Sequence, residues 1–177
     1  MRFKLIVLLL AITSFVQAQK VITRNGVIQF DATVPGATDQ VLAKNNSVSA
    51  ILDKATGALA VQVMIKSFRF KLPLMEEHFN ENYMESDQFP KATFKGKIKD
   101  FDSKSGSYEV EGDLMLHGIT QKVKTKLMVK NEAGKLYVEG MFNVKLKDYG
   151  LSVPAIAKKT LAETAKLTFD FIFEQKS

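Results

Sequence analysis

"SYEVEGDLMLHG", residues Ser107–Gly118, alternates apolar and polar side chains with a period of two. Val110, Leu114 and Leu116 fall on one face of an extended chain, and the intervening acidic residues fall on the other. Such alternation is typical of a β-strand that packs one face on a core and turns the other to water. The stretch therefore predicts a half-buried strand.

The same alternation continues along the chain on both sides of this stretch. In "KVKTKLMVK", residues 122–130, valine, threonine and leucine share one face and lysines occupy the other. Between residues 58 and 70 the apolar positions change parity, which predicts a bulge or sharp bend near Lys66–Ser67. Further strands are predicted at residues 26–32, 47–53, 58–70, 122–130, 135–146 and 166–175.

The predicted links between strands are short and carry turn residues. "KATG" at 54–57, "SKSG" at 103–106 and "NEAG" at 131–134 each end in glycine. This is typical of hairpins that close through a left-handed residue. A second helical turn or an irregular loop is expected at residues 154–164.

Only Leu72–Met84 predicts a helix, because Leu72, Met75, Phe79 and Tyr83 form an apolar stripe at helical spacing. About eight antiparallel strands in meander order, with this one short helix, predict an all-β barrel or sandwich. An eight-stranded barrel is the size that encloses one small ligand. The thirteen phenylalanines are equally consistent with a solid core.

The first eighteen residues predict a secretory signal peptide. Arg2 and Lys4 precede a mostly apolar run, and small residues stand at the predicted cleavage site after Ala18. Cleavage there leaves 159 of the 177 residues, a length that suits one domain spanning residues 19–177. No later apolar run is long enough to predict a transmembrane helix.

The composition excludes several functional classes. The chain has no cysteine, which removes disulfides, thiolate catalysis and thiolate metal sites. The formal net charge is +6, of which the predicted signal peptide supplies two, leaving +4. The lysines alternate along strands and do not cluster with exposed aromatics, so nucleic-acid binding is not expected. An anionic partner such as a lipid headgroup is left open.

Three stretches carry a resemblance to a known family: "HFNENYMESDQFPKATFKGKI" at 78–98, "GDLMLHGITQKV" at 112–123 and, more weakly, "KLKDYGLSVP" at 145–154. In their order and spacing they resemble the YceI-like family of exported bacterial proteins. The resemblance implies a lipocalin-like antiparallel barrel whose elongated apolar pocket holds a polyisoprenoid or similar long-chain amphiphile. It also implies a periplasmic or secreted location. The "KLKD" segment differs from many members, which carry an arginine there.

Strand parity and the resemblance together predict the ligand site. The helix from Leu72 is expected to lie near one end of the barrel as a lid or plug, with Met75 and Phe79 facing inward. Polar contacts at the pocket mouth are expected from Arg69, His78 and Asn82. The residues expected to line the pocket are Phe68, Phe70, Phe79, Tyr83, Phe94, Leu114, Leu116, Leu127, Phe142, Phe169 and Phe171.

A catalytic or metal-binding role is the weaker interpretation. His78 and Glu81 share a helix face, but a metal centre needs further ligands, and spacing does not tie His117 to them. There is no Gly-x-Ser-x-Gly elbow and no glycine-rich phosphate loop. We therefore expect no enzyme activity, no cofactor and no metal.

Two other interpretations remain beside lipid binding. A periplasmic stress or structural protein would fill the barrel with its own side chains and act through its surface. An outer-membrane barrel would place Lys122, Lys124 and Lys126 in a narrow lumen, where like charges repel one another, so it is disfavoured. A homodimer is left open, because nothing in the sequence decides the oligomeric state.

Overall fold

The computed structural model describes residues 20–174. The predicted signal peptide and its cleavage site lie outside the described residues. Nine strands form the fold: β1 (Lys20–Thr33), β2 (Leu42–Asp53), β3 (Ala58–Met64), β4 (Arg69–Phe70), β5 (Lys91–Ile98), β6 (Gly106–Leu116), β7 (Ile119–Glu132), β8 (Lys135–Lys145) and β9 (Leu161–Glu174). The helical elements are η3 (Ile65–Ser67), α2 (Pro73–His78), η4 (Phe79–Tyr83), η5 (Leu146–Tyr149) and η6 (Ala155–Ala157).

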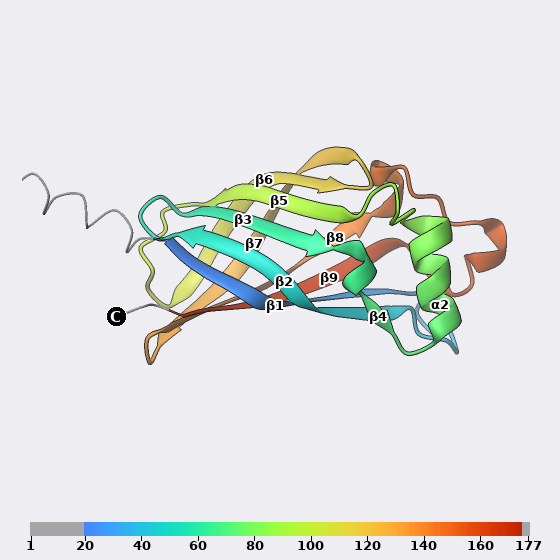
Figure 1. The fold of residues 1–177 in the computed structure, drawn as a ribbon, viewed down its shortest axis with the longest axis horizontal. Coiled ribbons are helices and arrows are strands. Elements are labelled where there is room, and N and C mark those ends of the chain that lie inside the picture. Colours follow the sequence, from blue (N-terminus) through green and yellow to red (C-terminus); the bar gives the residue numbers. More distant parts are fainter. Residues whose placement is uncertain (1–19, 175–177) are drawn as a thin grey trace, which may run out of the picture.

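The eight long strands close into an antiparallel barrel. Their order is β1-β9-β8-β7-β6-β5-β3-β2, and pairing between β1 and β2 completes the ring. The two-residue strand β4 adds to β2, with Phe70 opposite Ala43. The barrel is elongated, and α2 lies across one end (Figure 1). The predicted all-β barrel of about eight antiparallel strands with one short helix is confirmed.

The predicted strand faces are confirmed as well. Leu114, Val138 and Phe171 are buried inside the barrel. The lysines of β7 point outward, where Lys122 lies 3.0 Å from Asp113 and Lys124 lies 3.0 Å from Glu109 on β6. Such exposed ion pairs contribute little stability, so the buried apolar faces hold the barrel together.

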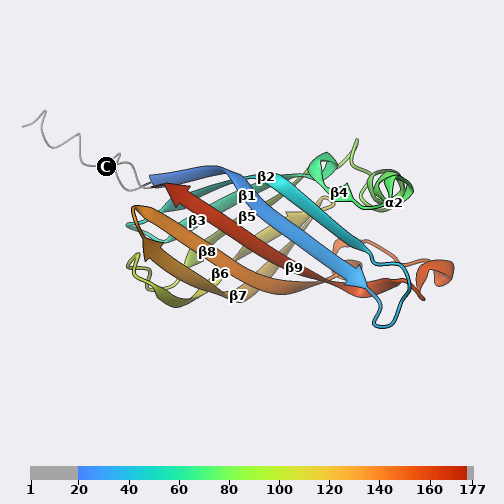
Figure 2. The same cartoon turned by 90° about the horizontal axis from the view of Figure 1, so that it is seen from below.

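The barrel has a tightly packed end, which carries the turns at residues 54–57, 99–105 and 133–134 (Figure 2). Five large apolar side chains from β2, β5, β8 and β9 pack there and have no exposed surface. They are Leu52, Ile98, Leu136, Val138 and Phe173.

The bend predicted near Lys66–Ser67 is a single 3₁₀ turn, η3. Met64 before the turn is exposed, whereas Ile65 and Phe68 are both buried. The turn therefore rotates the chain and keeps apolar residues of both parities inside the barrel. This explains the parity change seen in the sequence.

Two of the three glycine turns are as predicted, with Gly57 at φ 73° and Gly134 at φ 74°. The third prediction is wrong, because Gly106 begins β6 and Ser103 takes the left-handed conformation at φ 61°. Here the Asp102 carboxylate accepts a hydrogen bond from the backbone N–H of Lys104 and stabilises the turn through its side chain. The Lys104 ammonium and the Tyr108 hydroxyl hold the pKa of Asp102 well below its usual range.

The predicted helix is present but is not regular. α2 ends at His78 and continues as a π turn, in which the N–H of Met84 donates to the carbonyl of Phe79 at 2.9 Å. Leu72 precedes the first helical turn and is exposed, so of the predicted apolar stripe only Met75, Phe79 and Tyr83 face the cavity. Pro73 at the first helical position explains the start, because it needs no hydrogen-bond partner for a missing N–H.

Candidate ligand-binding cavity

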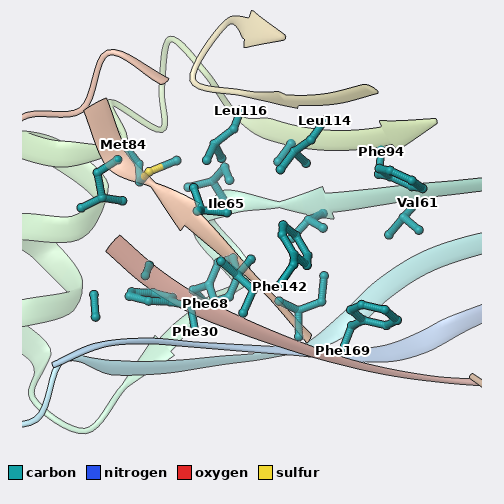
Figure 3. A pocket seen from close by; sticks show the side chains of 18 of the residues that line it. Phe30, Val61, Ile65, Phe68, Met84, Phe94, Leu114, Leu116, Phe142 and Phe169 are labelled. Carbon is teal, nitrogen blue, oxygen red and sulfur yellow. The ribbon is translucent and has the colours of Figure 1, made fainter. Parts of the chain in front are cut away.

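The half of the barrel next to α2 contains a cavity of about 210 Å³ (Figure 3). Every long strand except β2 contributes to its wall. Among the lining side chains only Tyr83, Thr93 and Thr125 carry a polar atom, and none is charged. The Thr125 hydroxyl donates to the Met141 carbonyl at 2.6 Å, so its polar atom is already satisfied. The wall is therefore almost entirely apolar.

Three phenylalanines form the inner boundary of the cavity, towards the packed end. Phe169 lies directly opposite Gly140 on β8, and a Cβ atom at Gly140 would come within 2.4 Å of the Phe169 ring. A Cβ atom at Gly96 would come equally close to Phe94. Phe171 stacks on Phe169 at 5.4 Å between ring centroids. Glycines thus leave the space into which these rings lie flat against the sheet.

A cluster of aromatic rings closes the other side of the cavity, beneath the helix. Phe79 of η4 stacks on Phe30 of β1 with 5.5 Å between ring centroids. Phe68 and Phe70 lie 5.7 and 5.0 Å from the same Phe79 ring. Met75 of α2 also lines the cavity, so the helix turns both residues inward, where the sequence places them. Contacts of this kind add about 0.5–1.5 kcal/mol per pair to the burial of the rings.

A carboxylate fastens the beginning of the helical segment to the barrel. Glu76 accepts hydrogen bonds from the backbone N–H of Phe70 at 3.1 Å and from the Arg69 guanidinium at 2.8 Å. The Arg69 guanidinium also donates to the carbonyls of Lys66 and Phe68. Because these partners belong to η3, β4 and the residue between them, Glu76 holds α2 against the rim.

A second carboxylate fastens the far end of the segment. Glu85 lies 2.9 Å from Nε2 of His117 in the β6–β7 turn, and the other ring nitrogen of His117 lies 3.3 Å from the Tyr149 carbonyl. The Phe89 ring packs on the same imidazole with 4.3 Å between ring centroids. Burial raises the pKa of the neighbouring Tyr149. Residues 73–84 are thus held as a lid between two fixed points.

Ten of the eleven residues predicted to line a pocket lie on the cavity wall. The exception is Leu127, for which the prediction is wrong: it is 1% exposed and does not line the cavity. Its inward parity was correct, but it lies too far along β7, towards the packed end. Whether the other ten contact a ligand stays a prediction.

The three residues predicted at the pocket mouth do not line the cavity. Arg69 is exposed and engaged with Glu76, and His78 and Asn82 are exposed on the lid. His78 precedes the inward Phe79, and Asn82 precedes the inward Tyr83. One step along a helix rotates the side chain by about 100°. They therefore fall on the outer face. Within residues 20–174 no three potential ligands lie together to hold a metal ion.

Sequence reasoning missed Phe30, although the alternation in residues 26–32 places it on the same face as the buried Ile28. Its contact with Phe79 could not be deduced, because it joins two distant parts of the chain. The cavity wall carries no carboxylate, imidazole or ammonium group. Such a wall can hold an apolar molecule and exclude water.

No helix in the part of the chain that the structure describes is long and apolar enough to cross a membrane. Residues 17–173 match a family model described as the YceI-like domain. No curated protein matches the sequence.

Several solved structures share the fold. A polyisoprenoid binding domain from Saccharophagus degradans implicated in plant cell wall breakdown has a TM-score of 0.74, with 13% identity over 89% of this chain and 99% of that one. Burkholderia cenocepacia BcnA has a TM-score of 0.70, with 14% identity over 83% of this chain and 95% of its own. A Campylobacter jejuni YCEI protein has a TM-score of 0.63, with 17% identity over 76% of this chain and 85% of that one.

Proposed function

Since this chain belongs to the YceI-like domain family, we propose that its barrel binds a polyisoprenoid or similar long-chain lipid and sequesters or carries it. The observation that carries the proposal is the uncharged cavity of about 210 Å³ beneath the lid. Each methylene that moves from water into such a space gains about 0.8 kcal/mol. The related Saccharophagus degradans domain, described as polyisoprenoid binding, supports the same class of ligand.

The size of the cavity suggests how a long chain would be accommodated. An apolar protein cavity of about 150 Å³ holds a benzene molecule. A volume of about 210 Å³ therefore accepts a short segment of a lipid chain with the lid closed. A longer chain requires the cluster of Phe30, Phe68, Phe70 and Phe79 to separate, and the lid to move with Phe79.

The proposal includes export to the periplasm or the outside of the cell. It rests on the charged, apolar and small-residue order of residues 1–18. The exported protein should then begin at Gln19, and N-terminal sequencing of the periplasmic fraction measures this. A soluble cytoplasmic pool that retains Met1 would refute the location and leave lipid binding unaffected.

Lipid binding is tested by placing a charge on the cavity wall. Phe142→Asp puts a carboxylate among the lining residues of β8, and an unsolvated carboxylate costs several kcal/mol. Met141→Asp is the matched control, because Met141 is the preceding residue, points outward and is exposed. We expect native mass spectrometry of protein purified from its own periplasm to show a hydrophobic mass bound to the wild type and to Met141→Asp. Phe142→Asp should lose it.

Circular dichroism of the same variants separates the rival interpretations. A hollow barrel admits water to the new carboxylate, so Phe142→Asp should still fold. If it unfolds, and the wild type never carries a lipid, the barrel is filled by its own side chains and the surface-acting alternative holds. Retention of the lipid by a folded Phe142→Asp variant would show that the ligand lies elsewhere.

A further inference from the structure

The loops at the two ends of the barrel differ in the apolar residues that they expose. At the lid end Leu72, Leu74 and Ile156 project into solvent from the start of α2 and from η6, and the last two are 62% and 94% exposed. At the packed end the turns at 54–57, 99–105 and 133–134 expose no large apolar side chain. Exposed apolar residues at loop tips therefore mark the end that contains the cavity.

These residues project separately and do not form one flat patch. Figures 1 and 2 show α2 and the loop that contains η6 extending from the same end of the barrel as two distinct projections. A stable interface between two proteins buries about 800 Å² on each partner. Three side chains on separate projections do not supply such a surface, but each can enter a soft apolar layer independently.

Lysines flank these apolar residues. Lys71 precedes Leu72, and Lys158 and Lys159 follow Ile156. Lys158 pairs with Glu163 at 3.0 Å, whereas Lys71 and Lys159 have no ion pair within residues 20–174. Apolar side chains next to free lysines fit the boundary between lipid tails and anionic headgroups.

Acidic residues on the lid limit the contribution of charge. Glu77 and Glu81 are exposed further along the helical segment and oppose the nearby lysines. The apolar side chains must therefore supply most of the binding, and the lysines orient them. This sets an expectation: loss of Ile156 or Leu74 should weaken binding more than loss of one lysine.

We propose that the lid end of the barrel docks on the surface of an anionic phospholipid bilayer, with Leu74 and Ile156 entering the headgroup layer. The purpose of this contact rests on the proposed lipid-binding function. A long apolar chain avoids water if the cavity opens directly against the membrane. Leu74 belongs to the lid and the next residue, Met75, lines the cavity, so a membrane contact at Leu74 acts on the element that closes the cavity.

The test is flotation of lipid-stripped protein with vesicles of mixed phosphatidylcholine and phosphatidylglycerol. The wild type should float with these vesicles and less well with phosphatidylcholine alone. Leu74→Ser and Ile156→Ser should each weaken partitioning about tenfold, the value expected for one apolar anchor. Met128→Ser is the matched control, because Met128 is 50% exposed on the outer wall of β7, and it should float like the wild type.

Lysine variants test the electrostatic part. Lys159→Ala should weaken flotation by a smaller factor than Ile156→Ser, and added salt should remove the difference from the wild type. Lys97→Ala, on the outer wall of β5, should have no effect. The proposal is overturned if the wild type does not float, or if the Leu74 and Ile156 variants float equally well.

Two further outcomes separate this proposal from related ones. If gel filtration shows a dimer that Ile156→Ser dissociates, the exposed residues join two copies of the chain and the membrane proposal is wrong. Because the protein carries no lipid in this assay, flotation does not depend on the proposed cargo. If the protein does not float but native mass spectrometry shows a bound lipid, only the docking proposal is rejected. If the protein floats normally but native mass spectrometry shows no bound lipid, only the proposed lipid binding in the cavity is rejected.

Discussion

Gly140 and Phe169 show how single residues shape the cavity. They lie opposite each other on β8 and β9, and the missing side chain of Gly140 leaves space for the Phe169 ring. The sequence pattern identified Phe169 as inward. It could not identify their pairing, because the long connection at residues 146–160 fixes no register between β8 and β9. Contact between ring and glycine is therefore a property of the folded sheet.

Gly140→Ala should destabilise the protein by about 1–3 kcal/mol, because the new methyl group overlaps the Phe169 ring and the carbonyl of Lys126. Gly106→Ala is the control, since the nearest atom to its Cβ would lie at 3.9 Å and its φ is not positive. The control should change stability by less than about 0.5 kcal/mol. Urea denaturation of both variants measures the difference, and equal midpoints would show that the ring moves aside freely.

Among the elements, the lid shows why helical periodicity in the sequence predicted only part of its structure. Met75, Phe79 and Tyr83 are spaced by four residues, which exceeds the 3.6 residues of an α-helical turn. A regular helix turns about 100° per residue, so Tyr83 would lie about 80° from Met75 around the helix axis. The π turn from Phe79 to Tyr83 is wider and keeps both residues on the cavity wall. The pattern predicted a helix and its inward face, but it did not reveal the change of helix type.

The lid should loosen when its first fastening is removed. Glu76→Ala deletes the acceptor for the Phe70 N–H and the Arg69 guanidinium. Amide hydrogen exchange in residues 73–84 should become faster, while exchange in the barrel strands stays unchanged. Glu77→Ala, one residue further along and exposed, should leave both rates unchanged. Unaltered exchange in Glu76→Ala would show that the aromatic cluster alone holds the lid.

At the scale of the whole molecule, the barrel is solid at one end and hollow at the other. Alternation along each strand predicted which residues face inward, and that part needed no knowledge of the fold. The depth at which each residue lies follows from strand register and from the position of the lid. Leu127 and Phe142 share the inward parity, yet one lies beyond the cavity and the other lines it. Position along the barrel axis is what the sequence could not supply.

The difference between the packed end and the cavity predicts that the same Leu→Ala substitution lowers the free energy of unfolding by unequal amounts. Leu136 is fully buried at the packed end, so Leu136→Ala opens a new void and should cost about 2–5 kcal/mol. Leu116 lines the existing cavity, where part of its surface has no packing partner. Leu116→Ala therefore loses fewer contacts and should cost less than half as much in lipid-free protein.

Urea denaturation of lipid-free wild type and both variants provides the measurement, with the slope of each transition checked for two-state behaviour. A bound lipid stabilises the folded state, and it should stabilise Leu136→Ala as much as the wild type because Leu136 does not touch the cavity. Its gain for Leu116→Ala should differ, since that substitution changes the wall against which the lipid packs. Equal costs for the two variants without lipid would mean that the cavity collapses in solution, and that a ligand has to open it.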